Sequence, residues 1–356
     1  VFALQDEITL EIASQLTTAL RSAQSEYQPK TEAYEELLRG HARMRHLSYD
    51  GTVRALRHYE KAIDHDPGFA SAYAAAAGAS LSQRIFGVEQ SSATLERAVK
   101  FNDAALAIDA DLLMARAIRA RLQLYLEYRL QDAITAMQAL QSEAPASPEL
   151  LAQLCYMLSW SGHFDALEAA ALELKRIDPY AVGSYTFLLQ VYAAAQRWDE
   201  VDRTVQTLFS IEPEHKNTWA LWVLSKAERD RVDEAYEMIV AKGMQDSPLA
   251  CSVYARQGDR DRIVDIIAKI EPQRSPILLA HLYALIEDVE GVVRMVRAGV
   301  ENHDFLLSQI VSKSQSVQRR LSINGRPLGD IYSSDEVQAV LREVGLDRQS
   351  IDAIRI

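Results

Sequence analysis

The sequence predicts an all-α, right-handed solenoid of about eight helix–turn–helix repeats with a C-terminal helical cap. Three observations predict it. Pro145, Pro179 and Pro213 follow one another at intervals of about 34 residues. The stretch between the last two prolines holds two helical patterns joined by a short polar break. Gly and Pro are sparse, at 14 and 10 residues, while apolar residues make up 48% of the chain. Because one such repeat cannot bury its own apolar face, the repeats must stack into one continuous body.

Residues 1–30 are expected to form an N-terminal helix and a linker. Apolar residues recur at helical spacing from Phe2 to Leu20, and the polar stretch that follows ends at Pro29. The chain opens on Val1 inside this helical pattern. We therefore expect the sequence to be a piece of a longer protein, with the first helix belonging to a preceding domain.

The solenoid is expected over residues 31–301, with six repeats of standard length up to about residue 246. In the first repeat, small and aromatic residues alternate at Ala55, Tyr59 and Ala62, which lets two helices approach closely. Asp50-Gly51 is expected to separate the two helices of this repeat. In the fifth repeat, Leu188 is expected to be buried between repeats.

The second repeat is too long for this period. The excess lies near Gln83–Ser92 and is expected to bulge out between the two helices. Extra loops on a solenoid often gather on a binding face, although an inert length variant explains the same observation.

Residues 247–301 are expected to hold two short repeats, and residues 302–356 to form capping helices. Each short repeat begins with a serine and a proline, Ser247-Pro248 and Ser275-Pro276, which suits an N-cap followed by the first helical position. In the cap, Ser333 or Ser334 can start the last helix, which Gly345 ends.

The pattern over about residues 31–300 resembles the tetratricopeptide repeat (TPR) superfamily. VFALQDEIT at the N-terminus looks like the last helix of the TolB-like domain of bacterial multidomain regulators. AYEELLRGHARMRHLSYDGTVRALRHYEKAIDHDPGFASAYA resembles the repeat region that follows that domain, and SSDEVQAVLREVGL is similar to the short helix that closes many such proteins.

In that group, the repeat tail follows either a class III adenylate/guanylate cyclase domain or an OmpR-type winged-helix DNA-binding domain. Nothing in this sequence resembles the metal-binding aspartates of the cyclases or a recognition helix. The resemblance therefore implies a regulatory or protein-binding tail of a bacterial signalling protein. The expected location is the cytoplasm, or the periplasm if the whole protein has an upstream membrane helix.

The composition and the motifs argue against most other functional classes of protein. A net charge of −12 disfavours nucleic-acid binding by this chain, and no window approaches the ~18 apolar residues of a membrane helix. Nucleophile-elbow, phosphate-loop and dinucleotide motifs are missing, so neither an enzyme nor a cofactor is expected. The histidines His41, His46, His58 and His65 lack metal-ligand spacing, so no metal is expected. The cysteines Cys155 and Cys251 are expected to be buried and reduced.

An arginine-rich stretch marks the first repeat, consisting of Arg39, Arg43, Arg45, Arg54 and Arg57. It suits an acidic partner or the missing upstream domain, although nearby carboxylates dilute it and a solvated helix face is the favoured explanation.

Partner binding is expected on the concave inner face, which the first helices of the repeats build. Aromatic and amide side chains suit extended peptides, because they stack on side chains and bond to main-chain groups. The candidates are Tyr125, Gln153, Tyr156, Trp160, Gln190 and Asn217. The same aromatic residues can instead belong to the core.

The expected partner is a protein or peptide, with the upstream domain or a second copy of the chain as further possibilities. The alternative function is a small-molecule sensor that controls an attached cyclase or DNA-binding domain. Its pocket would lie by the long loop of the second repeat or near the turn around residue 320.

Overall fold

The computed structural model describes residues 27–44, 49–85, 92–161, 163–213, 215–270, 276–303 and 329–346. Within these residues all regular secondary structure is helical, and no strand occurs. The chain is an all-α solenoid, as the sequence predicts.

Helices α2 to α17 form a series of packed pairs, each pair being a first helix followed by a second. The pairs are α2 (Thr31–Met44) with α3 (Tyr49–His65), α4 (Ala70–Ile85) with α5 (Ser92–Ile108), α6 (Leu113–Glu127) with α7 (Leu130–Glu143), α8 (Pro148–Ser161) with α9 (Phe164–Ile177), α10 (Val182–Ala194) with α11 (Trp198–Ile211), α12 (Lys216–Glu228) with α13 (Val232–Ala241), α14 (Pro248–Gln257) with α15 (Arg260–Ala268), and α16 (Pro276–Leu285) with α17 (Val289–Glu301).

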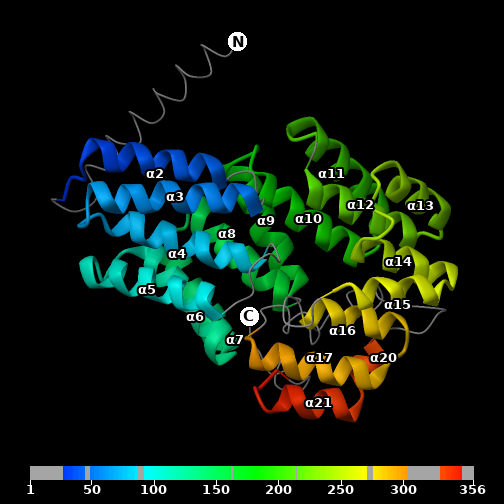
Figure 1. Ribbon diagram of the computed structural model, residues 1–356. Helices are drawn as coiled ribbons and strands as arrows, with labels where there is room; N and C mark the ends of the chain where they lie inside the picture. The colour runs from blue at the N-terminus through cyan, green and yellow to red at the C-terminus, as the bar shows by residue number, and fades with distance from the viewer. Residues whose placement is uncertain are drawn as a thin grey trace.

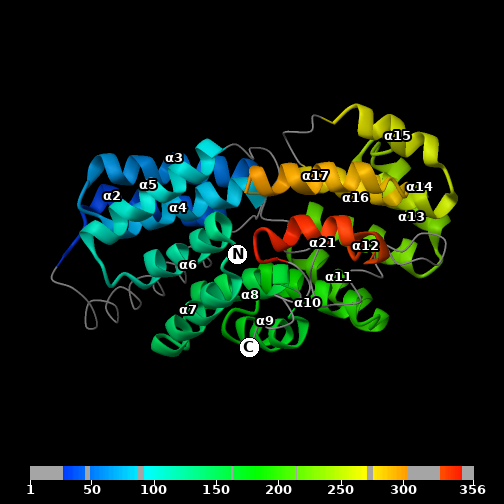
Figure 2. The ribbon, with the colours of Figure 1, turned by 90° about the horizontal axis from the view of Figure 1, so that it is seen from below.

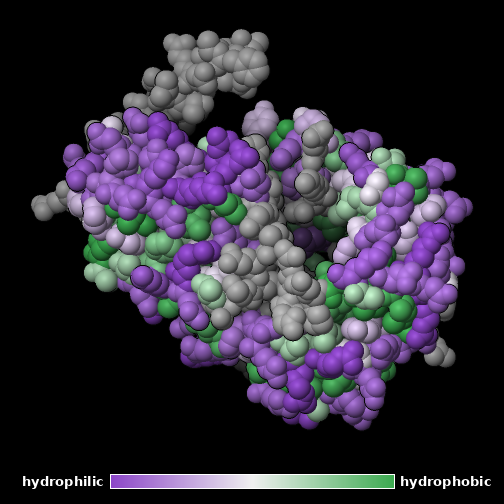
Figure 3. All heavy atoms as spheres, viewed as in Figure 1, coloured by the Kyte–Doolittle hydropathy of each residue, from purple (hydrophilic) through white to green (hydrophobic). Residues whose placement is uncertain are grey.

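The pairs stack in chain order and the stack curves back on itself (Figure 1). The end of α17 returns to the end of α6, where Tyr128 contacts Val300 and His303, so the two halves of the solenoid face each other (Figure 2). First helices pack on first helices of the next pair, as α6 does on α4 and α8, and α10 does on α8 and α12. The face shown in Figure 3 is mainly hydrophilic, with hydrophobic residues gathered over α4 and α5 and near α14 and α15.

Close packing of the first pair depends on small residues at the helix contact. Ala55 and Ala62 are fully buried, and Tyr59 is 1% exposed, as the alternation of small and aromatic residues predicts. A Cβ atom at Gly40 of α2 would collide with the Tyr59 ring. The tyrosine therefore fills the space that the missing side chain of Gly40 leaves open.

Asp50-Gly51 does not separate the helices of the first pair, contrary to the expectation. Both residues lie in the first turn of α3, and Asp50 forms an ion pair with Arg54 at 2.7 Å. A carboxylate in the first turn is favoured by the positive end of the helix dipole, so Asp50 begins a helix here rather than a turn.

The second pair absorbs part of its extra length by extending its helices. α4 has 16 residues and α5 has 17, so both ends of the Gln83–Ser92 stretch are helical rather than part of a bulge. Gln83 is 3% exposed and accepts a hydrogen bond from Arg97 of α5 at 2.5 Å. Residues 86–91 of the expected loop lie outside the described residues.

The short pairs begin at proline, and Ser247 is the N-cap residue of α14, both as expected. Pro248 and Pro276 are the first residues of α14 and α16. The hydroxyl of Ser247 donates to the carbonyl of Met244 at 2.7 Å and makes no cap bond. Ser275 lies outside the described residues.

A short C-terminal unit, α20 (Gly329–Tyr332) and α21 (Asp335–Arg342), packs on the last pair. Val337 and Leu341 of α21 are fully buried, and α21 lies along α17. Ser334 is the N-cap residue of α21, although its hydroxyl makes no cap bond. The first part of the expected cap, residues 304–328, lies outside the described residues.

A buried polar contact joins the cap to the solenoid. The hydroxyl of Tyr332 lies 2.6 Å from Nδ1 of His281 in α16, and the two rings meet edge to face with their centroids 5.6 Å apart. Burial lowers the pKa of His281 to about 4, because the apolar surroundings disfavour its charged form.

Replacing Leu188 by Ala should destabilise the protein by about 2–5 kcal/mol, because Leu188 is 1% exposed and its loss opens a cavity between pairs. Chemical denaturation followed by circular dichroism measures the change. Leu172→Ala is the matched control, because Leu172 is 46% exposed; its effect should stay within about 0.5 kcal/mol. Equal effects of the two substitutions would contradict the assigned burial of Leu188.

Stability should fall on acidification through the titration of His281. The folded-state pKa of about 4 lies below the unfolded value near 6.5, so the unfolded chain binds more protons between these limits. The His281 contribution is complete above about pH 6.5 and is lost toward pH 4, with a slope of at most ~1.4 kcal/mol per pH unit. The difference in unfolding free energy between wild type and His281→Gln, followed over this pH range, measures this contribution. His65→Gln replaces an exposed histidine, so it should leave the pH dependence of the unfolding free energy unchanged. If the unfolding free energies of wild type and His281→Gln ran parallel between pH 4 and 6.5, the proposed titration of His281 would be wrong.

Candidate inner-face site

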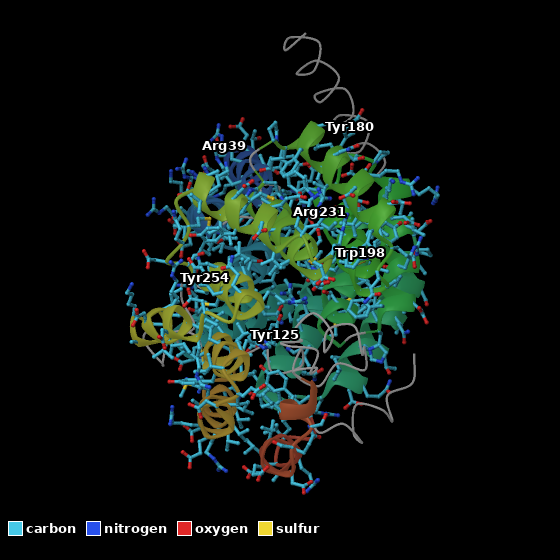
Figure 4. All side chains as sticks on the ribbon, turned by 90° about the vertical axis from the view of Figure 1, so that its right-hand side faces the viewer. Arg39, Tyr125, Tyr180, Trp198, Arg231 and Tyr254 are labelled. Atoms are coloured by element: carbon cyan, nitrogen blue, oxygen red, sulfur yellow. The ribbon has the colours of Figure 1, made fainter. Side chains whose placement is uncertain are left out.

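Helix α6 carries a stripe of polar and aromatic residues toward its neighbours in the stack. Arg121 and Tyr125 lie four residues apart in α6, so they share one side of the helix, and Tyr128 follows its last turn with a φ of 54°. Arg121 is 2% exposed and Tyr125 is 3% exposed. In Figure 4, Tyr125 lies well inside the outline of the molecule, whereas Tyr180 lies at its edge.

The guanidinium of Arg121 is held by neutral groups from α6 and α8. It donates to the amide oxygen of Gln153 at 2.5 Å and to the hydroxyl of Tyr125 at 3.4 Å. Its central carbon lies 5.9 Å from the ring centroid of Tyr125 and 5.7 Å from that of Tyr156. Amide, phenol and ring faces thus solvate a charge that burial would otherwise make costly.

Tyr156 connects this cluster to the next first helix. Its ring meets Phe187 of α10 edge to face, with the centroids 5.0 Å apart. Burial raises the pKa of Tyr156 to about 12, so its phenol stays protonated at neutral pH. A protonated phenol can both donate and accept a hydrogen bond.

A second polar contact repeats the first one, one pair further along. Ser159 of α8 donates to the amide oxygen of Gln190 in α10 at 2.5 Å, as Arg121 of α6 does to Gln153 of α8. Each bond joins a first helix to the first helix of the next pair. Helices α8 and α10 therefore each carry a glutamine amide that is bonded to the preceding first helix, and we call this pair, Gln153 and Gln190, the amide row.

The structure brings three of the predicted partner-binding residues together, since Tyr125, Gln153 and Tyr156 surround Arg121. Gln190 lies one pair further along the stack. Gln153, Tyr156 and Gln190 are partly exposed, whereas Tyr125 is part of the core. Trp160 is in α8 and Asn217 is in α12, and their side chains lie outside the described residues.

Arg121 at the centre of this cluster was not among the residues that the sequence predicts for the site. Its signal was an arginine inside the mainly apolar run ARLQLYL, four residues before Tyr125. A lone arginine in such a run also suits an exposed helix position. Only the arrangement of α8 beside α6 shows that its charge is buried.

The described residues contain no group of three His, Cys, Asp or Glu side chains that could hold a metal ion. Cys155 and Cys251 are free and buried, as their apolar surroundings predict, and burial raises the pKa of each thiol to about 12. A thiol with such a pKa is almost wholly protonated at neutral pH and is a poor nucleophile.

Two histidines of the first pair, His41 and His58, contact neighbouring side chains, whereas His46 lies outside the described residues. His58 lies 2.7 Å from the carboxylate of Glu36, which holds the pKa of that carboxyl below its usual value. His41 lies 3.1 Å from the hydroxyl of Tyr59. These contacts join α2 to α3, which suits a structural role.

Carboxylates partly neutralise the arginine-rich stretch of the first pair. Arg39 forms ion pairs with Glu35 and Glu36, and Arg54 forms one with Asp50. Arg45 lies outside the described residues. Exposed pairs of this kind contribute little to stability and leave only a modest local excess of positive charge.

An open cavity of about 430 Å³ lies between α5, α6 and α7, and neither glutamine of the amide row lines it. Apolar residues including Leu106 and Ala120 line it, together with Arg116 and Arg119. Both arginines are ion-paired, Arg116 with Glu143 at 2.7 Å and Arg119 with Asp103 at 2.6 Å.

No helix among the described residues is long and apolar enough to cross a membrane.

No protein-family model matches the chain, and no curated protein sequence matches it. Among solved structures it is similar to YrrB, a TPR protein with an unusual peptide-binding site, at 17% identity and a TM-score of 0.32 over 48% of this chain and 82% of YrrB. A TPR protein from Parabacteroides merdae shares 16% identity, with a TM-score of 0.35 over 79% of this chain and 99% of that one. Yeast Tom70 shares 13% identity, with a TM-score of 0.42 over 90% of this chain and 69% of Tom70.

Removing the amide oxygen of Gln153 should destabilise the protein through Arg121. Gln153→Ala deprives a buried guanidinium of a hydrogen-bond acceptor, which costs about 1–3 kcal/mol. Arg121→Met keeps the length of the side chain and removes the charge, so Gln153→Ala should cost less in that background. Chemical denaturation of wild type, the two single variants and the double variant gives the interaction free energy between Arg121 and Gln153, which we expect to be about 0.5–3 kcal/mol. Purely additive effects would show that the two side chains do not support each other.

Proposed function

We propose that this chain is a non-catalytic protein-interaction module of the TPR type that holds an extended peptide along its inner face. One observation carries the proposal. The amide row and the ring of Tyr156 lie along successive first helices, are partly exposed, and are fixed in place by Ser159 and Arg121.

These side chains have the chemistry that an extended peptide needs. The amide of Gln153 accepts a bond from Arg121 through its oxygen, and its NH2 group is a donor of the kind that bonds main-chain carbonyls. Gln153 and Gln190 repeat from one pair to the next, which suits a ligand that is itself a repeating main chain. The ring of Tyr156 offers an apolar face with a polar hydroxyl, a combination enriched at binding hot spots.

The wider setting of the module is also a proposal. Its resemblance at both ends supports a bacterial signalling protein in which residues 1–30 end a TolB-like domain, residues 31–301 form the repeats and residues 302–356 close them. The output domain would be a cyclase or a winged-helix DNA-binding domain upstream. Besides a peptide from another protein, the upstream domain or a second copy of the chain is a candidate partner.

A small-molecule sensor is the second candidate function, favoured by the cavity between α5, α6 and α7. Its volume of about 430 Å³ is within the range of small-molecule sites. Thermal-shift screening against metabolites tests it, because a ligand at ~100 times its Kd adds roughly 2.7 kcal/mol of stability. A hit that persists in the variants of the amide row would favour this cavity over the inner face.

Substitution of the amide row should weaken peptide binding. A random peptide library displayed on phage is selected on the immobilised full chain, and the best peptide is then titrated against variants. Gln190→Ala and Tyr156→Ala should each weaken its binding about tenfold or more, since both remove a contact at the proposed site. Tyr180→Ala is the matched control, because Tyr180 is 72% exposed at the outer edge of the molecule. If Gln190→Ala and Tyr156→Ala both bound the selected peptide with unchanged affinity, the proposal would be wrong.

A further inference from the structure

A buried amide without a partner lies in α5. Asn102 is fully buried, and in the described part of the chain neither its amide oxygen nor its NH2 group has a hydrogen-bond partner. An unpaired polar group costs stability when it is buried, because water satisfies the same group in the unfolded chain. Buried side chains of this kind are rare in folded proteins, so Asn102 requires an explanation.

The same position is apolar in the other pairs. Asn102 lies four residues after the buried Ala98 in the second helix of its pair. The residues at the equivalent position of the other second helices are all apolar and buried, and they are Tyr59, Met137, Ala171, Val205, Ile239, Ile267 and Val296. In the first pair, Tyr59 belongs to one core cluster with Phe69 next to α4. This position therefore helps to hold a pair against the next one, and the second pair has an amide there.

Around Asn102, α5 faces α6 of the third pair. Asp103 forms an ion pair with Arg119 of α6 at 2.6 Å. Leu106, one helical turn after Asn102, lines the cavity together with Ala120 of α6. Asn102 therefore lies at the joint between the second and third pairs.

The other contacts across this joint are weak as well. The Arg119–Asp103 pair contributes little, because its side chains are 45% and 57% exposed and solvent screens them. The open cavity of about 430 Å³ between α5, α6 and α7 leaves its lining atoms without packing partners on one side. Most of the fully buried residues that α4 and α5 contribute to the core shared with α6 are alanines, which bury little apolar area: Ala74, Ala77, Leu81, Leu95, Ala98 and Ala105.

The pairs on either side of this joint are held more firmly. The Tyr59 ring fills the space at Gly40 and shares a core cluster with Phe69 and α4, so the first two pairs form one unit, α2–α5. In Figures 1 and 2 these four helices lie together at one side of the molecule. Beyond the joint, the bond of Arg121 to Gln153 ties α6 to α8. The second joint is thus weaker than the joints that precede and follow it.

We propose that the joint between the second and third pairs is a hinge, at which the first two pairs swing as one arm away from α6. Because each pair contacts only its neighbours, one joint can open while every pair stays folded. Asn102 favours the open form, since water in the open joint satisfies its amide. The swing changes the distance between the inner sides of α4 and α6. The hinge rests on contacts of the chain itself and not on the proposed function.

Thiol labelling of the full chain tests the hinge. Ala120→Cys places a thiol on α6 at the joint, where Ala120 is 2% exposed. The native Cys155 and Cys251 are buried in α8 and α14 and serve as internal standards. At low iodoacetamide concentration each labelling rate follows the population of the open form. The introduced thiol should react faster than both native thiols. Asn102→Leu should slow it about tenfold, because this near-isosteric change removes the unpaired amide, and should leave the native thiols unchanged.

Met137→Leu is the matched control, because it places leucine at the equivalent position of the next pair without removing an amide. It should leave the labelling rate of the introduced thiol unchanged. Hydrogen exchange followed by mass spectrometry needs no introduced thiol, so it decides the question if Ala120→Cys does not fold. Asn102→Leu should slow exchange in α4 and α5, which lack the support of α6 in the open form, but not in α8 and α9. Equal labelling rates of all three thiols, or no effect of Asn102→Leu on labelling and exchange, would overturn the hinge.

Discussion

The whole structure depends on the burial of each helix pair against the next pair. No pair holds enough apolar surface to form a core alone, so the largest buried cluster runs from Ala74 in α4 to Leu346 after α21. A second cluster, built around Tyr59, joins α2 and α3 to α4, and a third joins α10 and α11. Stability is therefore a sum over neighbouring interfaces, and substitutions such as Leu188→Ala act on the interface to which they belong.

The same constraint creates the candidate site. Stacking places the first helices side by side, so polar residues on their shared side must find partners on the neighbouring pair. Arg121 meets this need with Gln153, and Ser159 meets it with Gln190. These bonds fix the amides of Gln153 and Gln190 relative to the neighbouring first helix, so the residues of the proposed function also contribute to the stability of the stack.

Local departures from the repeat were harder to predict than the repeat itself. Asp50-Gly51 has the composition of a turn but lies in the first turn of α3, because a carboxylate is favoured at a helix start. The serine-proline pairs marked the starts of α14 and α16, yet Ser247 bonds backward to Met244. Asp259 and Asp288, in contrast, cap α15 and α17, accepting from the main chain of Arg262 and Gly291. Turn and cap chemistry depends on dihedral angles that composition leaves open.

The sequence by itself determined the all-helical class, the stacking of helix pairs and the burial of residues such as Tyr59 and Leu188, because helical periodicity and side-chain size are local properties. It also predicted that Tyr125, Gln153 and Tyr156 lie on the same face of the solenoid. Only the tertiary structure decided that Arg121 joins them and that Tyr128 reaches Val300 and His303 near the other end of the stack. The curvature that brings these groups together is the accumulated rotation of many interfaces, and no single repeat encodes it.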